Sequence, residues 1–168
     1  SPLQINAQVP FEAGAPAVTS VTVRNALSQT VASVRIASEQ PGIFTVDSSG
    51  SGAGAIRHDS GGLSVSAQSP AIPGEIVQLY ATGLGRVSPP ILSGQAAPPQ
   101  PLSPTIIPAT VTMNGVSAPV GFAGLAPGFV GLYQVNVQVP QIAAGTAQVV
   151  LTINGVASPP VTMAVGSR

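Results

Sequence analysis

One stretch of sequence occurs twice in this chain, and its first copy stands at the start of the sequence. Residues 133–140 read Tyr-Gln-Val-Asn-Val-Gln-Val-Pro, and residues 3–10 read Leu-Gln-Ile-Asn-Ala-Gln-Val-Pro. The similarity continues, because residues 20–28 align with residues 150–158 at the same offset of 130 positions. Strand-like sequence at residues 74–132 precedes the second copy, whereas nothing comparable precedes the first. We therefore expect the back half of one domain, followed by a whole domain of the same kind.

The repeat divides the chain into three predicted units. Residues 1–40 form a partial unit, residues 41–72 form a connector with a β-hairpin, and residues 73–168 form a complete domain. In the partial unit we expect strands at residues 3–9, 18–24 and 31–37, joined in one three-stranded sheet. Apolar and polar residues alternate along these strands, and Val21, Val23, Ala32, Val34 and Ile36 are expected to face inward.

The complete unit shows the pattern of an all-β sandwich. Short alternating runs at residues 75–82, 110–113, 117–122, 132–139, 147–153 and 160–165 are punctuated by a chain total of 19 glycines and 18 prolines. Asn114-Gly115 and Asn154-Gly155 predict tight hairpin turns. The proline-rich residues 88–108 are expected to lie against the domain as an extended edge and loop, because proline cannot donate to a β-ladder. No helix is expected.

Charged residues are unusually scarce, and their scarcity excludes one class of function. Asp, Glu, Lys and Arg make up 6% of the residues, where about 25% is usual, and the formal net charge is zero. Nucleic-acid binding needs a dense basic face, so it is not expected here. A weakly charged surface also lacks the self-repulsion that keeps proteins apart, which favours assembly.

Other composition features set further limits. Cysteine is absent, so disulfides and thiolate chemistry are excluded. No apolar stretch approaches the length of a membrane span, and no signal peptide stands in the sequence. An exported protein with this sequence would therefore be a processed form or a part of a longer one.

The order of motifs resembles the IPT/TIG group of immunoglobulin-like domains. An opening strand at residues 74–85 ends in a glycine-rich bend, Val111 to Gly115 enters a hairpin, the strand at residues 133–140 closes in Val-Pro, and residues 149–155 end in a final hairpin. Residues 123–128 together with 133–137 are similar to the uncharacterized Solibacter-type C-terminal domain family of large exported acidobacterial proteins. That resemblance implies an immunoglobulin-like sandwich and an extracellular or cell-surface location, with no assigned activity. Family members also carry the front half of the first unit.

No group of residues predicts catalysis, a cofactor or a metal. His58 is the only histidine, and its neighbours Asp59 and Ser60 indicate a solvated turn more than a catalytic triad. Asp47 and Asp59 could contribute to a calcium site only with several further oxygen ligands. The glutamates are scattered along the chain, which gives no support for a paired-carboxylate glycosidase. We expect the protein not to be an enzyme.

Few aromatic residues are available for a sugar-binding platform. Tyr133 shares a strand face with Val135 and Val137, which predicts a core tyrosine, whereas the side-chain direction of Tyr80 is ambiguous. Phe122 and Phe129 flank a glycine-containing loop where partial exposure is expected. Carbohydrate binding therefore stays open as a weakly supported alternative.

The incomplete first unit suggests self-association. Its apolar side carries Leu3, Ile5, Val9, Val21 and Val23, and a large apolar face of this kind marks an interface. The amides of Gln134, Asn136 and Gln138 form a second, uncharged candidate contact surface. We expect a non-catalytic extracellular structural subunit whose partners are other copies of itself, joined head to tail into a filament. The alternative is a passive stalk or C-terminal accessory module of a larger exported protein.

Overall fold

The protein is an all-β chain of antiparallel sheets. A computed structural model describes residues 5, 7–14 and 16–167. Within these residues the chain forms a 3-10 turn, η1, at Phe11–Ala13 and twelve strands. The strands are β1 (Ala17–Arg24), β2 (Gln29–Ile36), β3 (Gly42–Ile43), β4 (Ile56–His58), β5 (Ile76–Thr82), β6 (Ala109–Met113), β7 (Val116–Ala118), β8 (Val120–Leu125), β9 (Tyr133–Gln138), β10 (Gly145–Ile153), β11 (Val156–Ala157) and β12 (Val161–Val165).

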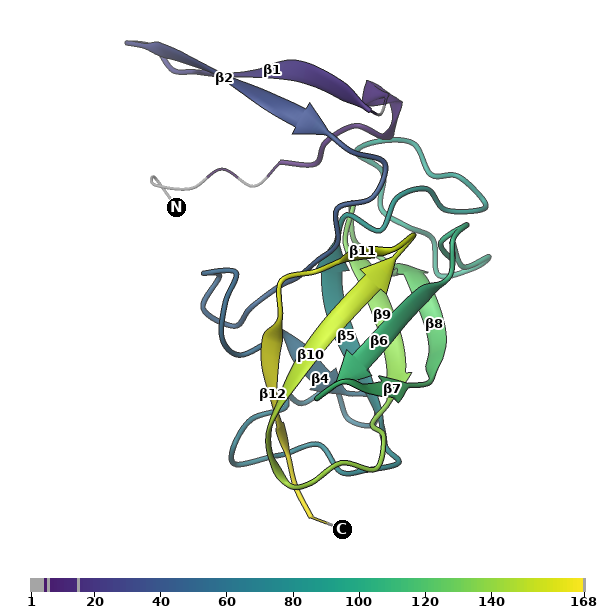
Figure 1. Ribbon diagram of the computed structural model, residues 1–168. Coiled ribbons are helices and arrows are strands. Elements are labelled where there is room, and N and C mark those ends of the chain that lie inside the picture. Colours follow the sequence, from purple (N-terminus) through teal and green to yellow (C-terminus); the bar gives the residue numbers. More distant parts are fainter. Residues whose placement is uncertain (1–4, 6, 15, 168) are drawn as a thin grey trace.

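Two five-stranded sheets face each other in a sandwich-like arrangement. One sheet has the order β11-β10-β6-β7 with β12 paired to β10, and the other has the order β3-β5-β9-β8 with β4 paired to β5. Figure 1 shows β6, β10 and β12 in front of β5 and β9. Alternate residues of β9 and β10 point into one shared core, as the period of a strand requires. Among the described residues there is no helix that is long and apolar enough to cross a membrane.

Both Asn-Gly turns form as predicted. Asn114 and Gly115 have positive φ angles and join Met113 to its partner Val116 across β6 and β7. The Asn154-Gly155 turn joins β10 to β11, and both of its residues also have positive φ angles. Positive φ at both central residues is the type I′ geometry, whose twist matches that of the strands.

The proline-rich residues 88–108 lie against the domain, as the sequence predicts, and residues 103–105 follow the edge of β8. Thr105 donates its N–H to the Ala123 carbonyl, and Leu125 donates to the Ser103 carbonyl. These bonds pair the outer edge of β8 through a segment that has no regular strand of its own. The edge is therefore covered, which limits uncontrolled strand addition at this side of the sandwich.

The segment between residues 41 and 72 contributes directly to the second sheet. Ile43 of β3 pairs with Ala81, and Ile56 of β4 pairs with Leu79, so both short strands lie along β5. Ile43 and Ile56 are buried in the sandwich core. The pairing shows that this segment covers an edge of β5 and fills part of the core.

The prediction of a three-stranded first unit is wrong for the residues that the structure describes. β1 and β2 form a two-stranded hairpin, while residue 5 and residues 7–9 are not in a strand. The repeat gives the reason: an offset of 130 aligns residues 3–8 with β9 and β1 with β10, and β9 and β10 belong to opposite sheets. The first segment is therefore the counterpart of β9, which faces β10, the counterpart of β1, across the core.

Candidate functional site

The β1–β2 hairpin has one apolar face and one polar face. Eight residue pairs run from Ala17 opposite Ile36 to Arg24 opposite Gln29, and residues directly opposite share a face. The apolar hairpin face comprises Ala17, Thr19, Val21, Val23, Thr30, Ala32, Val34 and Ile36. The register thus places the five residues expected to face inward on one side. Both arginines of the hairpin, Arg24 and Arg35, lie on the opposite side.

The apolar hairpin face and the segment before it are open to water in this single chain. Val21 is 47% exposed, whereas its repeat counterpart Leu151 is 0% exposed. Ile5 is 72% exposed, whereas its counterpart Val135 is 0% exposed. The sequence pattern that builds a core in the complete domain is thus present in the first unit without the sheets that would cover it. Val9 and Val23 are also exposed, and Leu3 lies outside the described residues.

The segment that leads into the hairpin is fixed to the sandwich. The Gly94 N–H donates to the Gln8 side chain over 2.9 Å, and the Phe11 N–H donates to the Ser93 hydroxyl over 2.8 Å. The same hydroxyl donates to Glu12 over 2.6 Å and lowers the pKa of that carboxyl. Phe11 also packs against the core. This end of the hairpin is therefore held in a defined place.

The segment that leaves the hairpin is fixed as well. The Gln40 N–H donates to the Gly83 carbonyl over 2.9 Å, and the Asn154 amide donates to Glu39 over 3.1 Å. Figure 1 shows β1 and β2 projecting from the end of the sandwich at which β11 lies. Anchors on both sides hold the hairpin at this end of the sandwich, and its residues are not part of the sandwich core.

The predicted amide strip lies on the outer face of the second sheet. Gln134 and Asn136 are half-buried and bonded to each other over 2.8 Å, while Gln138 is exposed and donates to the Gly74 carbonyl. These three side chains point away from the core, as their alternation with Tyr133, Val135 and Val137 predicts. Whether they touch a partner stays a prediction.

His58 does not lie in a solvated turn, which corrects the interpretation from sequence. It is the last residue of β4 and half-buried, and its Nδ1 atom lies 2.6 Å from Glu75 Oε1. Its Nε2 atom lies 3.1 Å from both the Ser69 hydroxyl and the Ser69 carbonyl oxygen. Asp59, the neighbour in sequence, instead accepts a bond from Gln78. Sequence spacing gives no signal for this contact, because pairing of β4 with β5 brings His58 and Glu75 together.

The Ser69–His58–Glu75 chain has the atoms of a hydrolase triad, but residues 69 and 70 offer no free N–H to an oxyanion. A nucleophilic serine needs N–H donors aimed at the developing oxyanion. The Ser69 N–H is already donated to Ser66, and Pro70 has no N–H to offer. Glu75 also accepts the Ile72 N–H over 2.9 Å. The arrangement ties the loop between β4 and β5 to the start of β5.

The acidic candidates for a calcium site are engaged in local bonds. Asp47 accepts bonds from the backbone and hydroxyl of Ser49, and these bonds lower the pKa of its carboxyl. Asp59 instead accepts a hydrogen bond from the side-chain amide of Gln78. In the part of the chain that the structure describes, no three His, Asp or Glu side chains gather into a metal-binding group.

The aromatic residues divide between core and surface. Tyr133 is buried as predicted, its hydroxyl donates to the Gly85 carbonyl, and burial raises its pKa to about 12. Tyr80 points outward, on the opposite side of β5 from Leu79 and Ala81, and is half-buried. Phe122 is half-buried and Phe129 is 56% exposed, so partial exposure is confirmed for both.

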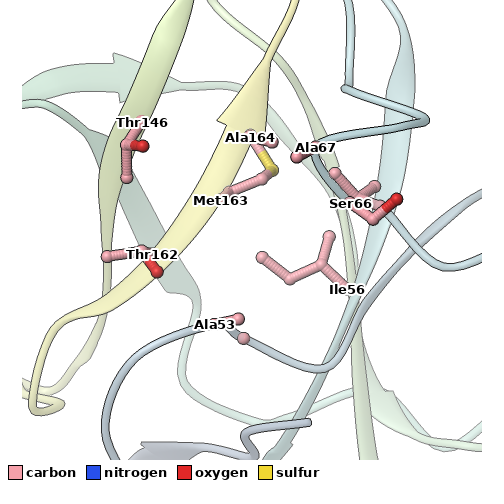
Figure 2. Close-up of a pocket in the computed structure, with 10 residues that line it drawn as sticks. Ala53, Ile56, Ser66, Ala67, Thr146, Thr162, Met163 and Ala164 are labelled. Atoms are coloured by element: carbon pink, nitrogen blue, oxygen red, sulfur yellow. The ribbon is translucent and has the colours of Figure 1, made fainter.

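A small gap opens between β12 and the segment near β4. Figure 2 shows Ile56 and Met163 on its walls, with Ser66 and Thr162 at its sides. Its volume is about 150 Å³, below the roughly 300–1,000 Å³ of ordinary ligand pockets, and its lining carries no titratable side chain. We treat it as a packing gap at the sandwich edge.

Comparison with protein-family models and with curated proteins finds no match to this chain. The assignment of function therefore depends on the geometry above.

Proposed function

We propose that this chain is a non-catalytic structural module that self-associates through its β1–β2 hairpin. The observation that carries the proposal is the apolar hairpin face, which has the sequence of a sandwich core and remains exposed in the single chain. Large exposed apolar faces mark contact surfaces. The engagement of the Ser69 N–H and the lack of an N–H on Pro70 support a role without catalysis.

Burial of this face would supply a useful driving force. Full burial of a valine or isoleucine contributes about 1.5–3 kcal/mol relative to full exposure. Val21 and Val23 are about half exposed, and Val34 and Ile36 are half-buried, so these four would add on the order of 3–6 kcal/mol. Both arginines lie on the other face, so no charge has to leave water in the contact.

The open edges of the hairpin suggest how copies join. Within the described residues β1 and β2 pair only with each other, so each strand has one free edge. A strand or sheet from a second copy can add to such an edge and cover the apolar hairpin face. If that second copy contributes its sandwich rather than its hairpin, the contact is head to tail, and repetition gives a filament.

The proposal also covers the type of sandwich and the location of the protein. We assign the sandwich to the immunoglobulin-like IPT/TIG type, on the support of the Asn-Gly hairpins, the glycine-rich bend after β5 and two facing antiparallel sheets. The similarity of residues 123–128 to exported acidobacterial C-terminal domains supports an extracellular or cell-surface location.

Size-exclusion chromatography with light scattering tests the self-association. We expect the native chain to form oligomers at micromolar concentration and Val21→Glu to yield monomers, because the new carboxylate would be buried without a partner. Val18→Glu is the matched control, since Val18 lies on the polar hairpin face and is 71% exposed. A monomeric native chain, or equal behaviour of the two variants, would contradict the proposal.

The alternative is a passive accessory module of a larger exported protein. In that case residues preceding this sequence in the same polypeptide would cover the apolar hairpin face. A longer chain that includes those residues distinguishes the two: if that longer chain is a monomer, the accessory module is favoured. Oligomers of that longer chain that Val21→Glu dissociates favour self-association.

A further inference from the structure

A groove of about 370 Å³ lies over Tyr80 on the outer side of the second sheet. Phe44 follows β3 and reaches the groove from one side of β5, while Phe129 comes from the loop between β8 and β9 on the other side. Phe44 is 45% exposed and Phe129 is 56% exposed. Three aromatic rings thus line one groove, in a chain with only six phenylalanine and tyrosine residues in total.

One charged side chain lines the groove. Arg57 of β4 lines it, and the guanidinium carbon lies 5.8 Å from the centre of the Tyr80 ring. Among the described residues the ion pair His58–Glu75 is the only one, so Arg57 has no carboxylate partner there. Asp59, two residues further along the chain, is bonded to Gln78. The Arg57 guanidinium therefore lies beside exposed rings without an ion pair of its own, while the Asp59 carboxylate is held on Gln78, the residue opposite Arg57 in the register.

The backbone beneath the groove is already paired. Tyr80 donates its N–H to Ala55 and accepts the Phe44 N–H, and β5 is paired with β9 on its other side. An extended peptide that binds by adding a strand needs an open edge, which this part of the sheet does not offer. The ligand must therefore be recognised by side chains, namely by the ring faces and by the guanidinium.

We propose that this groove binds an acidic polysaccharide, a chain of sugar rings that carry carboxylates. The C–H faces of sugar rings pack on aromatic rings, and a guanidinium pairs with a carboxylate in a bidentate geometry that ammonium lacks. The volume fits the range of ligand pockets. This site is separate from the β1–β2 hairpin and does not depend on self-association.

Isothermal titration with oligogalacturonate, a short uronic-acid chain, tests the site in the full chain. We expect saturable binding that weakens with added salt, and weaker binding of the same oligosaccharide after methyl esterification. Arg57→Gln should weaken binding of the acid form about tenfold or more and remove the preference over the ester. Phe129→Ala should weaken binding of both forms, because it removes a ring and leaves the charge.

Two controls keep the result specific. Arg35→Gln, on the polar hairpin face, removes the same charge elsewhere and should bind like the native chain. Arg57 and Phe129 are exposed, and thermal melts of each variant check that the fold is kept; Phe129→Leu serves in place of Phe129→Ala if the latter unfolds. The proposal is overturned if the native chain binds neither oligosaccharide, if Arg57→Gln and Arg35→Gln behave alike, or if polyglutamate binds as tightly as oligogalacturonate.

Discussion

The Tyr133 hydroxyl donates a hydrogen bond to the backbone carbonyl of Gly85. This bond connects the first residue of β9 to the glycine-rich bend that follows β5. The bend is needed because the chain leaves the second sheet there and enters the proline-rich segment. A core tyrosine thus closes the sandwich at the same end at which residues 39–40 join the hairpin to it.

Tyr133 should make the protein sensitive to alkaline pH. Burial raises its pKa from 10.0 to about 12, so the folded state favours the neutral phenol. This contribution to stability is fully present below the unfolded pKa of about 10 and is lost as pH rises toward about 12. Urea unfolding across this range should show falling stability for the native chain. Tyr133→Phe should cost about 1 kcal/mol near neutral pH, because Gly85 loses its donor, and should flatten the alkaline decline.

Tyr80→Phe is the control for that experiment. Tyr80 is half-buried on the outer sheet face, so this variant keeps the core tyrosine and should keep the alkaline decline. A decline of equal size in Tyr133→Phe would assign the effect to other groups.

Gly83 should tolerate no side chain. Its φ angle is +72°, and a Cβ atom would overlap the carbonyl oxygen of Gln40. Gly94 has a similar φ of +81° but open space around it. Gly94→Ala should therefore lower the free energy of unfolding only by the strain of an alanine in the left-handed conformation, about 1–2 kcal/mol. Gly83→Ala should cost clearly more, since the Gln40 backbone and the hairpin base must move; thermal melts of the two variants measure the difference, and equal melting temperatures would refute the argument.

Glu75 should matter for the loop between β4 and β5. Its two oxygens accept from His58 and from the Ile72 N–H, so Glu75→Ala leaves two donors without a partner. We expect a loss of about 2–3 kcal/mol in chemical denaturation and faster hydrogen exchange at Ile72. Glu39→Ala is the comparison, because Glu39 makes an exposed bond to Asn154 and should cost less than about 1 kcal/mol. A similar cost for both variants would show that the Glu75 bonds are not specially stabilising.

Local patterns in the sequence were sufficient for the complete domain. Alternation in β9 identified Tyr133, Val135 and Val137 as core residues, because a strand has a fixed period of two. Asn114-Gly115 identified a hairpin because few residue pairs accept two positive φ angles. Both signals are contained in a few consecutive residues, so they need no knowledge of tertiary structure.

Contacts between distant residues were not predictable in the same way. Residues 3–9 alternate as β9 does, yet those described there form no strand, because a strand exists only when another strand pairs with it. The contact of His58 with Glu75 depends on the register of β4 against β5, which no local pattern specifies. The groove at Tyr80 likewise combines residues from five separate segments.

The proposed association should respond to temperature and salt as an apolar contact does. The apolar hairpin face carries no charged residue, so raising NaCl from about 0.05 to about 0.5 M should not dissociate the oligomer, although exposed charge pairs are screened over that range. Cooling should weaken association, because apolar burial loses driving force at low temperature, whereas added sulfate should strengthen it. Sedimentation velocity measures each change. Dissociation by NaCl would instead assign the contact to charged groups such as Arg24 and Arg35 on the opposite face.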